Sequence, residues 1–333
     1  MNILITGCFG FIGFNFLQTC LNDLQNDFNI SGIDSLNNPY SKLNHNLIKE
    51  ENFEFFKEDI KNIMNVDFKN KNFDMIINFA AESHVDTSIY NPALFIDSNI
   101  LGVNNLLNFC VKNNIDNFIQ ISTDEVYGST SKENKFFVES DILNPSSPYS
   151  ASKASADMIC NAYEKTYGIN IKKIRPANNY GPFQQPEKLI PFSISNIIKN
   201  NEVEIYGDGS NIRHWLYVKD TVSGILKVIE YGKSSEVYNI GSGIYFNNNE
   251  IALKLLEKFE LDSSSIKYVK DRPGHDFKYA VNFDKLIALG WNPKYEFDFA
   301  LEETIKWNVN NIKWLQENIK QIRKNRKLRF ESK

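Results

Sequence analysis

The fold is decided by the stretch Asn2-Ile3-Leu4-Ile5-Thr6-Gly7-Cys8-Phe9-Gly10-Phe11-Ile12-Gly13. Its first four residues predict a short buried strand, and apolar residues recur at helical spacing after Gly13. Glycines at positions 7, 10 and 13 stand between strand and helix. Such glycines permit a tight turn and a close approach of the backbone to a pyrophosphate, and the helix N-terminus offers unpaired N–H groups to phosphates. Although glycines also mark ordinary turns, their place after a strand predicts a dinucleotide-binding site.

Short apolar strands alternate with helices through the first half of the chain. Further strands are expected at residues 28–33, 53–57, 75–79, 118–121 and 169–174. This alternation predicts an α/β fold, a Rossmann-type doubly wound parallel sheet with a smaller α/β substrate-binding lobe. We expect residues 1–176, with a contribution from 215–240, to form the dinucleotide-binding domain, and residues 177–333 to form mainly the second lobe. Because no clean linker separates the lobes, we expect them to be interleaved.

Acidic and small residues follow the next strands, where a cofactor would lie. Asp34 ends the second strand about 20 residues beyond the last glycine, as expected of an acid that binds a ribose 2′-hydroxyl. A carboxylate there would repel a 2′-phosphate, which favours NAD over NADP. The alternative for Asp34 is an ordinary turn aspartate. Asp59-Ile60 after the third strand are candidate adenine contacts, and Ala80-Ala81 after the fourth are small enough to let the cofactor lie against the backbone.

The composition indicates a globular protein that acts on small molecules. The chain has 333 residues, of which 42% are hydrophobic, and a formal net charge of -4. Surfaces that bind nucleic acid are usually basic, so this charge argues against one. The four cysteines have no C-x-x-C spacing, which predicts buried free thiols, no metal site and a reducing cytoplasm. The N-terminus begins directly with a strand and no apolar run approaches ~18 residues, so neither export nor a membrane is expected.

Reactive side chains are expected where the strand at 118–121 ends, in the run Ser122-Thr123-Asp124-Glu125-Val126-Tyr127-Gly128. A parallel strand opens there into the ligand crevice, and the run supplies a hydroxyl and two adjacent acids. Further on, Tyr149 and Lys153 stand four residues apart, so on a helix they share one face and the ammonium can lower the pKa of the phenol. Such a tyrosine can take a proton from an alcohol. The alternative for the two acids is a polar strand end or a helix cap.

Two arginines later in the chain favour a substrate that carries a nucleotide. Arg213 precedes His214 and Trp215, and Arg272 precedes Pro273-Gly274. A guanidinium beside aromatic or Gly/Pro residues suits a diphosphate held by two parallel hydrogen bonds, with a base stacked nearby. For each arginine taken alone, a surface ion pair is the better interpretation. Beside a dinucleotide site, the two together favour a nucleotide-linked substrate.

Several motifs together resemble a known family. The glycine loop, Tyr149-x-x-x-Lys153 and Asn178-Asn179-Tyr180-Gly181-Pro182 are similar to those of extended short-chain dehydrogenases/reductases that act on nucleotide sugars. The runs that narrow the resemblance to the dTDP-glucose 4,6-dehydratases are residues 122–128, Ala80-Ala81-Glu82-Ser83-His84-Val85-Asp86, Pro186-Glu187-Lys188-Leu189-Ile190-Pro191 and Asp271-Arg272-Pro273-Gly274-His275-Asp276. The resemblance extends to about Trp307. Its most specific mark is the adjacent Asp124-Glu125 pair.

The resemblance implies an NAD-dependent 4,6-dehydratase that converts dTDP-glucose or UDP-glucose to the 4-keto-6-deoxyglucose nucleotide and water. Such an enzyme oxidises the sugar at C4, eliminates water across C5 and C6, and returns the hydride to C6, so each step needs its own proton carrier. By this resemblance, Tyr149 with Lys153 takes the C4 hydroxyl proton, and Thr123 bonds near the C4 oxygen. Glu125 removes the C5 proton, and a protonated Asp124 donates to the departing C6 hydroxyl. Burial and mutual repulsion can separate the titrations of two adjacent acids.

The other implied site residues fall into two sets. Those expected to bind the cofactor are Gly7, Gly10, Phe11, Ile12, Gly13, Asp34, Asp59, Ile60, Ala80, Ala81, Ser83, Asn99, Tyr149, Lys153 and Asn179. Those expected to bind the substrate are Ser83, Thr123, Asn178, Lys188, Leu189, Glu204, Tyr206, Arg213, Asn248, Arg272 and His275. Most of the second set would hold the nucleotide diphosphate.

Two positions depart from the family pattern. Thr87 stands where the family usually has arginine, and His214 stands where it usually has aspartate. Both lie in or near loops expected to contact ligands, so the sequence does not choose between dTDP and UDP. The two bases differ by one methyl group, which is worth only ~1 kcal/mol in an apolar pocket.

Other functions stay open at this point. A C4 epimerase or a UDP-glucuronate decarboxylase of the same superfamily would need neither acid of the Asp124-Glu125 pair. A non-catalytic protein that binds NAD and a nucleotide sugar would have no need of five reactive groups. The family further suggests a homodimer, formed through helices near residues 99–112 and 148–165. The basic stretch 320–329 is most simply a solvated helix end.

Overall fold

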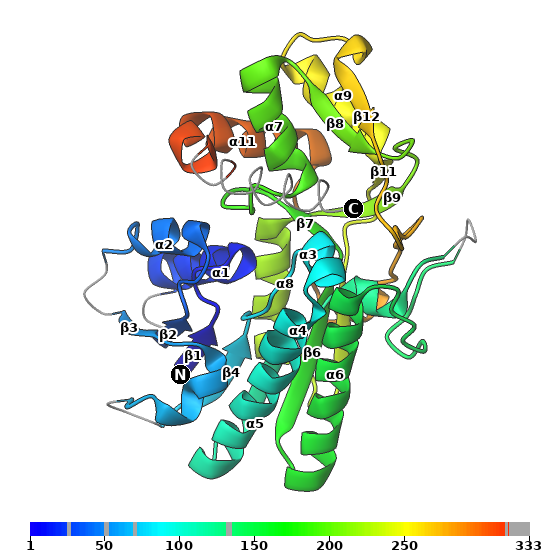
Figure 1. Ribbon diagram of the computed structural model, residues 1–333. Coiled ribbons are helices and arrows are strands. Elements are labelled where there is room, and N and C mark those ends of the chain that lie inside the picture. The colour runs from blue at the N-terminus through cyan, green and yellow to red at the C-terminus, as the bar shows by residue number, and fades with distance from the viewer. Residues whose placement is uncertain (25–27, 50–52, 69–71, 131–134, 317–318, 320–333) are drawn as a thin grey trace.

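The computed structural model describes residues 1–24, 28–49, 53–68, 72–130, 135–316 and 319, and its elements form two lobes (Figure 1). The larger lobe, in the lower part of Figure 1, is a sheet covered by helices, and the smaller lobe stands above it. The basic stretch 320–329 lies outside the described residues.

The larger lobe is built on a sheet with, among the described residues, seven strands in the order β10-β6-β5-β4-β1-β2-β3. Every neighbouring pair is parallel. The strand order reverses between β1 and β4, which is where an open parallel sheet binds its ligand. The predicted doubly wound parallel sheet is therefore confirmed. Its strands are β1 (Asn2–Thr6), β2 (Asn29–Asp34), β3 (Glu54–Lys57), β4 (Met75–Asn78), β5 (Asn117–Ile121), β6 (Asn170–Pro176) and β10 (Val237–Ile240).

Helices cover both faces of this sheet. Alternate residues of a strand point to opposite sides, so Ile3 and Ile5 of β1 join the core beneath α1 and α8, whereas Leu4 joins the core beneath α5 and α6. A sheet buried on both faces needs strands that are apolar throughout, as these are. The helices of this lobe are α1 (Phe11–Asp23), α2 (Pro39–His45), α3 (Val85–Tyr90), α4 (Pro92–Phe95), α5 (Gly102–Asn113), α6 (Pro148–Tyr167), α8 (Val218–Tyr231) and α10 (Asp284–Ile287), with short 3-10 turns at Ile60–Asn65 and Asp124–Tyr127.

One helix of the larger lobe is long and apolar. α4, a π-helical turn (Ile96–Leu101) and α5 continue one another from Pro92 to Asn113, and these 22 residues could cross a membrane by length and composition alone. Asp97, Lys112 and several asparagines interrupt this stretch, so it is not one continuous apolar run, and one such helix is weak evidence for a membrane span. Core helices pass the same test, and here Leu106 and Leu107 are fully buried against the sheet.

The smaller lobe has its own core, in which helices pack on two small sheets. Its elements are β7 (Asn178–Tyr180), α7 (Leu189–Asn200), β8 (Val203–Tyr206), β9 (Ile212–Tyr217), β11 (Tyr245–Asn247), α9 (Asn248–Lys258), a 3-10 turn (Ser263–Ser265), β12 (Ile266–Val269) and α11 (Phe297–Asn310). From β9 the chain returns to the larger lobe through α8 and β10 before it enters β11. The domain boundary at residue 176 stays a prediction.

The predicted local features agree closely with the structure. Each predicted strand overlaps an observed one, and its ends differ by at most two residues. Phe28 and Phe53, which were expected to begin strands, instead pack against the core just outside them. All four cysteines are buried free thiols, as predicted.

Candidate active site

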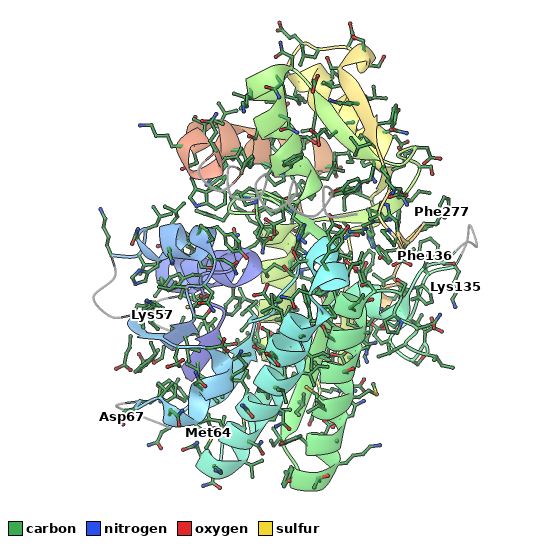
Figure 2. The ribbon with its side chains drawn as sticks, in the orientation of Figure 1. Lys57, Met64, Asp67, Lys135, Phe136 and Phe277 are labelled. Atoms are coloured by element: carbon green, nitrogen blue, oxygen red, sulfur yellow. The ribbon has the colours of Figure 1, made fainter. Side chains whose placement is uncertain are left out.

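A cleft of about 470 Å³ lies between the lobes, at the carboxyl ends of β1, β2, β4, β5 and β6. Side chains from both lobes reach into this region (Figure 2). All of the predicted cofactor-binding, substrate-binding and catalytic residues except Asn99 line the cleft. Residues more than 100 positions apart in the sequence are thus brought together at one site.

The glycine loop has the shape that a dinucleotide requires. Gly7 has a φ of +63°, and a Cβ built on it would lie 2.6 Å from the Ala80 backbone. A Cβ on Gly13 would lie 2.4 Å from the Gly7 carbonyl oxygen. Side chains are therefore excluded where the end of β1, the start of α1 and the end of β4 approach one another. The backbone N–H groups of this turn and of the α1 N-terminus suit a pyrophosphate, so the residues present fit NAD.

Asp34 and Asn99 each hold backbone next to the cleft. The Asp34 carboxylate accepts N–H groups from Phe9 at 3.1 Å and Leu36 at 2.9 Å, which fixes the glycine loop against the end of β2. Burial nevertheless raises the pKa of Asp34. Asn99 does not line the cleft. Its side chain bonds the backbone N–H and carbonyl of Glu82 at 2.8 and 3.0 Å, so it supports the cofactor-side segment and does not face the cleft.

Tyr149 and Lys153 share one face of α6, whose start is fixed by a capping box at Ser147. The Lys153 ammonium donates to the Ile121 carbonyl at 2.6 Å, and burial lowers its pKa to about 8. Burial, followed by the charge of Glu125, raises the pKa of Tyr149. The expectation that Lys153 lowers the pKa of this phenol was therefore wrong for the structure as it stands. The reason is that the ammonium bonds the end of β5, and the acids opposite the phenol oppose its ionisation.

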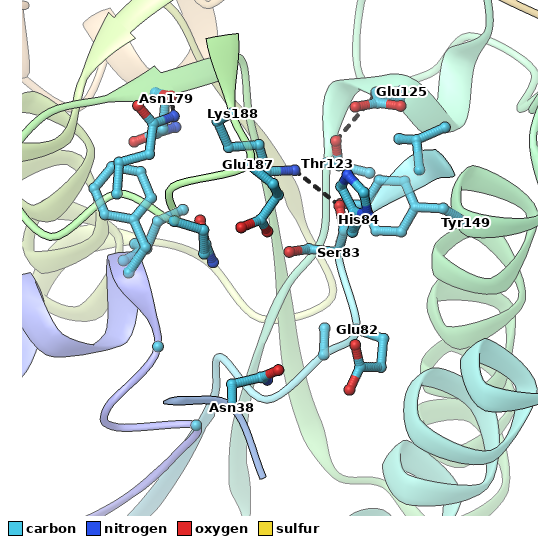
Figure 3. Close-up of a pocket in the computed structure, with 18 of the residues that line it drawn as sticks. Asn38, Glu82, Ser83, His84, Thr123, Glu125, Tyr149, Asn179, Glu187 and Lys188 are labelled. Atoms are coloured by element: carbon cyan, nitrogen blue, oxygen red, sulfur yellow. Dashed lines mark hydrogen bonds between the residues drawn. The ribbon is translucent and has the colours of Figure 1, made fainter. Parts of the chain in front are cut away.

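The two adjacent acids begin a 3-10 turn immediately after β5, and Thr123 caps that turn by accepting the Glu125 N–H at 3.3 Å (Figure 3). They are thus a capped turn, as the alternative interpretation proposed, and also part of the cleft lining. Burial, and then the neighbouring Glu125 charge, raise the pKa of Asp124 well above its usual range. Only 2% of Asp124 is exposed, and its Oδ2 has no hydrogen-bond partner among the described residues. This environment favours the protonated form of the Asp124 carboxyl group.

Glu125 has a different electrostatic environment. Burial raises its pKa, but Arg272, Lys188 and Arg213 oppose this rise. These cations come from the smaller lobe, and Lys188 also donates to the Ser83 carbonyl at 2.9 Å (Figure 3). The pKa of Glu125 is still raised on balance, but unlike Asp124 it has three cations that favour its carboxylate form. A region with three cations also suits the two phosphates of a nucleoside diphosphate.

Sequence reasoning missed Tyr279. Its hydroxyl donates to the carboxylate of Asp276 and lies 3.4 Å from the Glu125 carboxylate, and its ring packs 4.6 Å from the Arg213 guanidinium. Tyr279 therefore places a phenol beside the acid that was expected to act as a base. The signal was available, because Tyr279 stands three residues after the motif that ends at Asp276. Glu82 and Glu187 also line the cleft and were not predicted as site residues.

Neither departure from the family pattern lines the cleft. The Nε2 of His214 accepts the N–H groups of Ser242 at 2.8 Å and Gly243 at 2.9 Å, and its ring stacks on Tyr245. Burial lowers the pKa of His214 to about 3, so a neutral imidazole serves there as an acceptor. Thr87 bonds the Nδ1 of His84 at 2.7 Å. Both residues bond neighbouring protein groups, and both stand beside residues that line the cleft, Asp86 next to Thr87 and Arg213 next to His214.

Known proteins resemble the chain over most of its length. A family model described as GDP-mannose 4,6-dehydratase matches residues 4–304. The dTDP-glucose 4,6-dehydratase of Haemophilus influenzae is 39% identical, over 93% of this chain and 98% of that one. The crystal structure of DesIV, a dTDP-glucose 4,6-dehydratase from Streptomyces venezuelae with NAD bound, has a TM-score of 0.91 and 36% identity over 96% of this chain and 100% of that chain. A UDP-glucose 4-epimerase from Thermotoga maritima has a TM-score of 0.82 but only 28% identity, over 94% and 100%.

Proposed function

The chain belongs to the dTDP-glucose 4,6-dehydratase family of the extended short-chain dehydrogenases/reductases, and from that premise we propose how its cleft dehydrates a nucleotide-diphosphate glucose. The chain is an NAD-dependent 4,6-dehydratase, a hydro-lyase. We propose that its substrate is dTDP-glucose or UDP-glucose and that its product is the 4-keto-6-deoxyglucose nucleotide. The observation that supports this reaction best is the buried Asp124-Glu125 pair in the cleft with Tyr149 and Lys153, in which burial and the Glu125 charge raise the pKa of Asp124 while three cations oppose the rise at Glu125.

We propose that the oxidation step depends on Tyr149. NAD, held along the glycine loop, Asp34 and Ala80-Ala81, supplies the acceptor for the C4 hydride and the donor that returns it to C6. The Tyr149 hydroxyl bonds the Thr123 side chain, which lowers its pKa against the effect of burial. We assign the proton of the C4 hydroxyl to Tyr149, and Lys153 lies one helical turn away on the same face of α6.

The elimination step is assigned to the two acids. A 4-ketone makes the C5 proton acidic, and the Glu125 carboxylate removes it. The protonated Asp124 donates its proton to the C6 hydroxyl, which leaves as water, so the acid and the base change protonation state together. The raised pKa of Asp124 supports its role as the donor, because a carboxyl group must be neutral at working pH to act as a general acid.

Product analysis tests this function. NAD-loaded protein is incubated separately with dTDP-glucose and UDP-glucose, and the products are examined by mass spectrometry and NMR. The proposal predicts loss of one water and a 4-keto group from at least one of the two substrates. If folded, NAD-loaded protein produced no 4-keto sugar from either, the proposal would be wrong. The faster substrate also identifies the preferred nucleotide.

The nearest rival is a C4 epimerase, because a UDP-glucose 4-epimerase shares the fold. An epimerase returns the hydride to C4 and loses no water, so it would yield the galactose nucleotide of unchanged mass. The Asp124-Glu125 pair favours the dehydratase, since epimerisation needs no general acid for a leaving hydroxyl.

We further propose that two copies of the chain pair through α5, α6 and the turn that precedes α5. Ile96, Leu101 and Met158 on these helices are 50%, 48% and 49% exposed, which is high for apolar side chains next to one another in the fold. A second copy would bury them and would cover the exposed side of the helix Pro92–Asn113. Light scattering tests this, because a dimer has twice the mass of one chain and a monomeric mass would contradict the proposal.

A further inference from the structure

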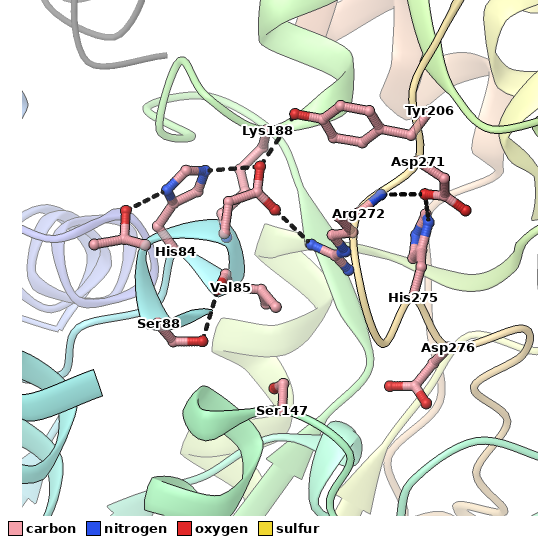
Figure 4. Close-up of polar contacts among 12 residues, drawn as sticks. His84, Val85, Ser88, Ser147, Lys188, Tyr206, Asp271, Arg272, His275 and Asp276 are labelled. Carbon is pink, nitrogen blue, oxygen red and sulfur yellow. Dashed lines mark hydrogen bonds and ion pairs between the residues drawn. The ribbon is translucent and has the colours of Figure 1, made fainter. Parts of the chain in front are cut away.

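The segment that follows β4 joins the two lobes through three hydrogen bonds. Lys188 donates to the Ser83 carbonyl at 2.9 Å, Arg272 donates to Asp86 at 3.1 Å, and the Tyr206 hydroxyl donates to Asp86 at 3.1 Å. The segment itself belongs to the larger lobe, whereas the three donors come from the smaller one (Figure 4). A change in this segment is thus transmitted directly to the groups expected to bind the substrate.

Asp86 is the centre of this connection. Its Oδ1 accepts from Arg272 and its Oδ2 accepts from Tyr206, so one carboxylate holds groups that lie 186 and 120 residues away. The ion pair is well shielded, since the side chains of Arg272 and Asp86 are 20% and 15% exposed. Burial raises the pKa of Asp86, but His84 and Arg272 outweigh that effect, and the net pKa is lowered. Asp86 therefore stays ionised near neutral pH and keeps both donors.

Asp86 leaves most of the Arg272 guanidinium available to a ligand. Only NH1 of Arg272 bonds the carboxylate, while the buried Nε has no hydrogen-bond partner among the described residues. Arg272 also interacts with the charge of Glu125. The hydrogen bond to Asp86 thus fixes one end of a guanidinium whose charge also acts on the proposed base.

The far side of Asp86 is also fixed. The Nε2 of His84 lies 4.0 Å from the carboxylate, and the Nδ1 of His84 is held by Thr87 at 2.7 Å. Thr87 stands at the position where the family usually has arginine, so in this chain a hydroxyl bonded to His84 replaces a cation next to Asp86. The charged groups around the carboxylate are then Arg272 and, when it is protonated, His84.

We propose that Asp86 is a positioning residue that sets Arg272 and Tyr206 in place for the diphosphate of the substrate. This inference rests on the proposed function, because Arg272 and Tyr206 have a ligand to bind only if the cleft takes a nucleotide-diphosphate sugar. Asp86 lines the cleft but is not one of the proposed proton carriers. Because Asp86 already holds Arg272 and Tyr206 in place, these side chains lose less conformational freedom when the ligand binds.

The test is the Asp86→Asn variant of the NAD-loaded protein, with binding of dTDP and, separately, UDP measured by calorimetry. Asparagine keeps the size of the side chain but presents an amide N–H₂ to one of the two donors. We expect the Kd for the nucleoside diphosphate and the KM for the sugar nucleotide to rise about 10- to 100-fold, the usual effect of losing a hydrogen bond to a charged group. We expect kcat to change by less than about three-fold, because the proton carriers are untouched.

Two further variants make the result interpretable. Tyr206→Phe removes one of the two donors to Asp86. Its effect on the Kd should be much smaller in the Asp86→Asn background than in the wild type, because both substitutions break the same Tyr206–Asp86 contact. Asp298→Asn is the matched control, since Asp298 pairs with Lys254 at 2.9 Å away from the cleft. This control should leave Kd, KM and kcat unchanged.

The proposal is overturned if Asp86→Asn binds dTDP and UDP within about two-fold of the wild type, or if the two substitutions are additive. If Asp86→Asn does not fold, the proposal fails when Tyr206→Phe alone leaves Kd unchanged. Failure of the proposed function looks different. In that case the wild-type protein itself binds neither nucleotide, or it makes no 4-keto product.

Discussion

Replacing Glu125 by glutamine is the most informative single change to the reacting end of the cleft. Glutamine has nearly the same shape, so the side chain can remain among the groups that surround it. The change removes one negative charge from a position that faces Arg272, Lys188 and Arg213. It also removes the only proton acceptor that we assign to C5.

The size of the effect follows from those two facts. A positioned general base contributes about 100- to 10,000-fold, so kcat should fall by that factor, which corresponds to about 3–5 kcal/mol. The three cations lose an anionic neighbour, so they should hold the substrate diphosphate at least as well as before. KM should therefore stay within about three-fold of the wild type.

The assay separates the two halves of the reaction. Formation of 4-keto-6-deoxy product is followed at steady state, and the absorbance of the reduced nicotinamide is followed after rapid mixing. With Glu125→Gln, the rapid rise in absorbance should persist, because Tyr149 and Lys153 are unchanged, while product formation should nearly stop. The matched control is Glu302→Gln, which alters an exposed partner of Lys258. Turnover of Glu125→Gln at the wild-type rate would refute the assignment of Glu125 as the base.

Three other predictions follow from the site. Because the pKa of Lys153 is about 8, kcat should fall as the pH rises through that value, and Lys153→Arg should move the fall to higher pH in a pH–rate profile. The pKa of Asp124 is raised in the folded state, so its ionisation destabilises the protein as the pH rises above the pKa of the unfolded chain. Asp124→Asn should therefore raise the free energy of unfolding at pH 7, and this gain should vanish in denaturant titrations at about pH 3. Gly7→Ala should weaken NAD binding more than about ten-fold in calorimetry, because its Cβ would meet the Ala80 backbone, whereas Gly168→Ala, with nothing within 4 Å, should not.

Much of the fold could be predicted because it depends on local patterns. The apolar runs of β1 and β5, and the glycines between β1 and α1, are decided by residues a few positions apart. The helix Pro92–Asn113 mixes apolar residues with several asparagines, so the sequence pattern alone does not show which of its side chains are buried. Its burial against the sheet became visible only in the folded chain.

The parts of the site that could be predicted are those formed by residues close together in the sequence. The acid pair and the four-residue spacing of Tyr149 and Lys153 are of that kind. The direction in which the Lys153 ammonium donates is not, because its acceptor, the Ile121 carbonyl, is 32 residues away. Asp86 was not predicted as a site residue for the same reason. Its partners, Arg272 and Tyr206, belong to the other lobe and lie more than 100 residues away in the sequence.

The central claim is that one site removes a hydride at C4, eliminates water, and returns the hydride at C6. The most direct measurement uses a glucose nucleotide that carries deuterium at C4, incubated with NAD-loaded protein and analysed by NMR and mass spectrometry. If the hydride moves from C4 to C6 as proposed, the 4-keto product has lost one water and carries the deuterium in its C6 methyl group. Deuterium found again at C4 of a sugar of unchanged composition would contradict it.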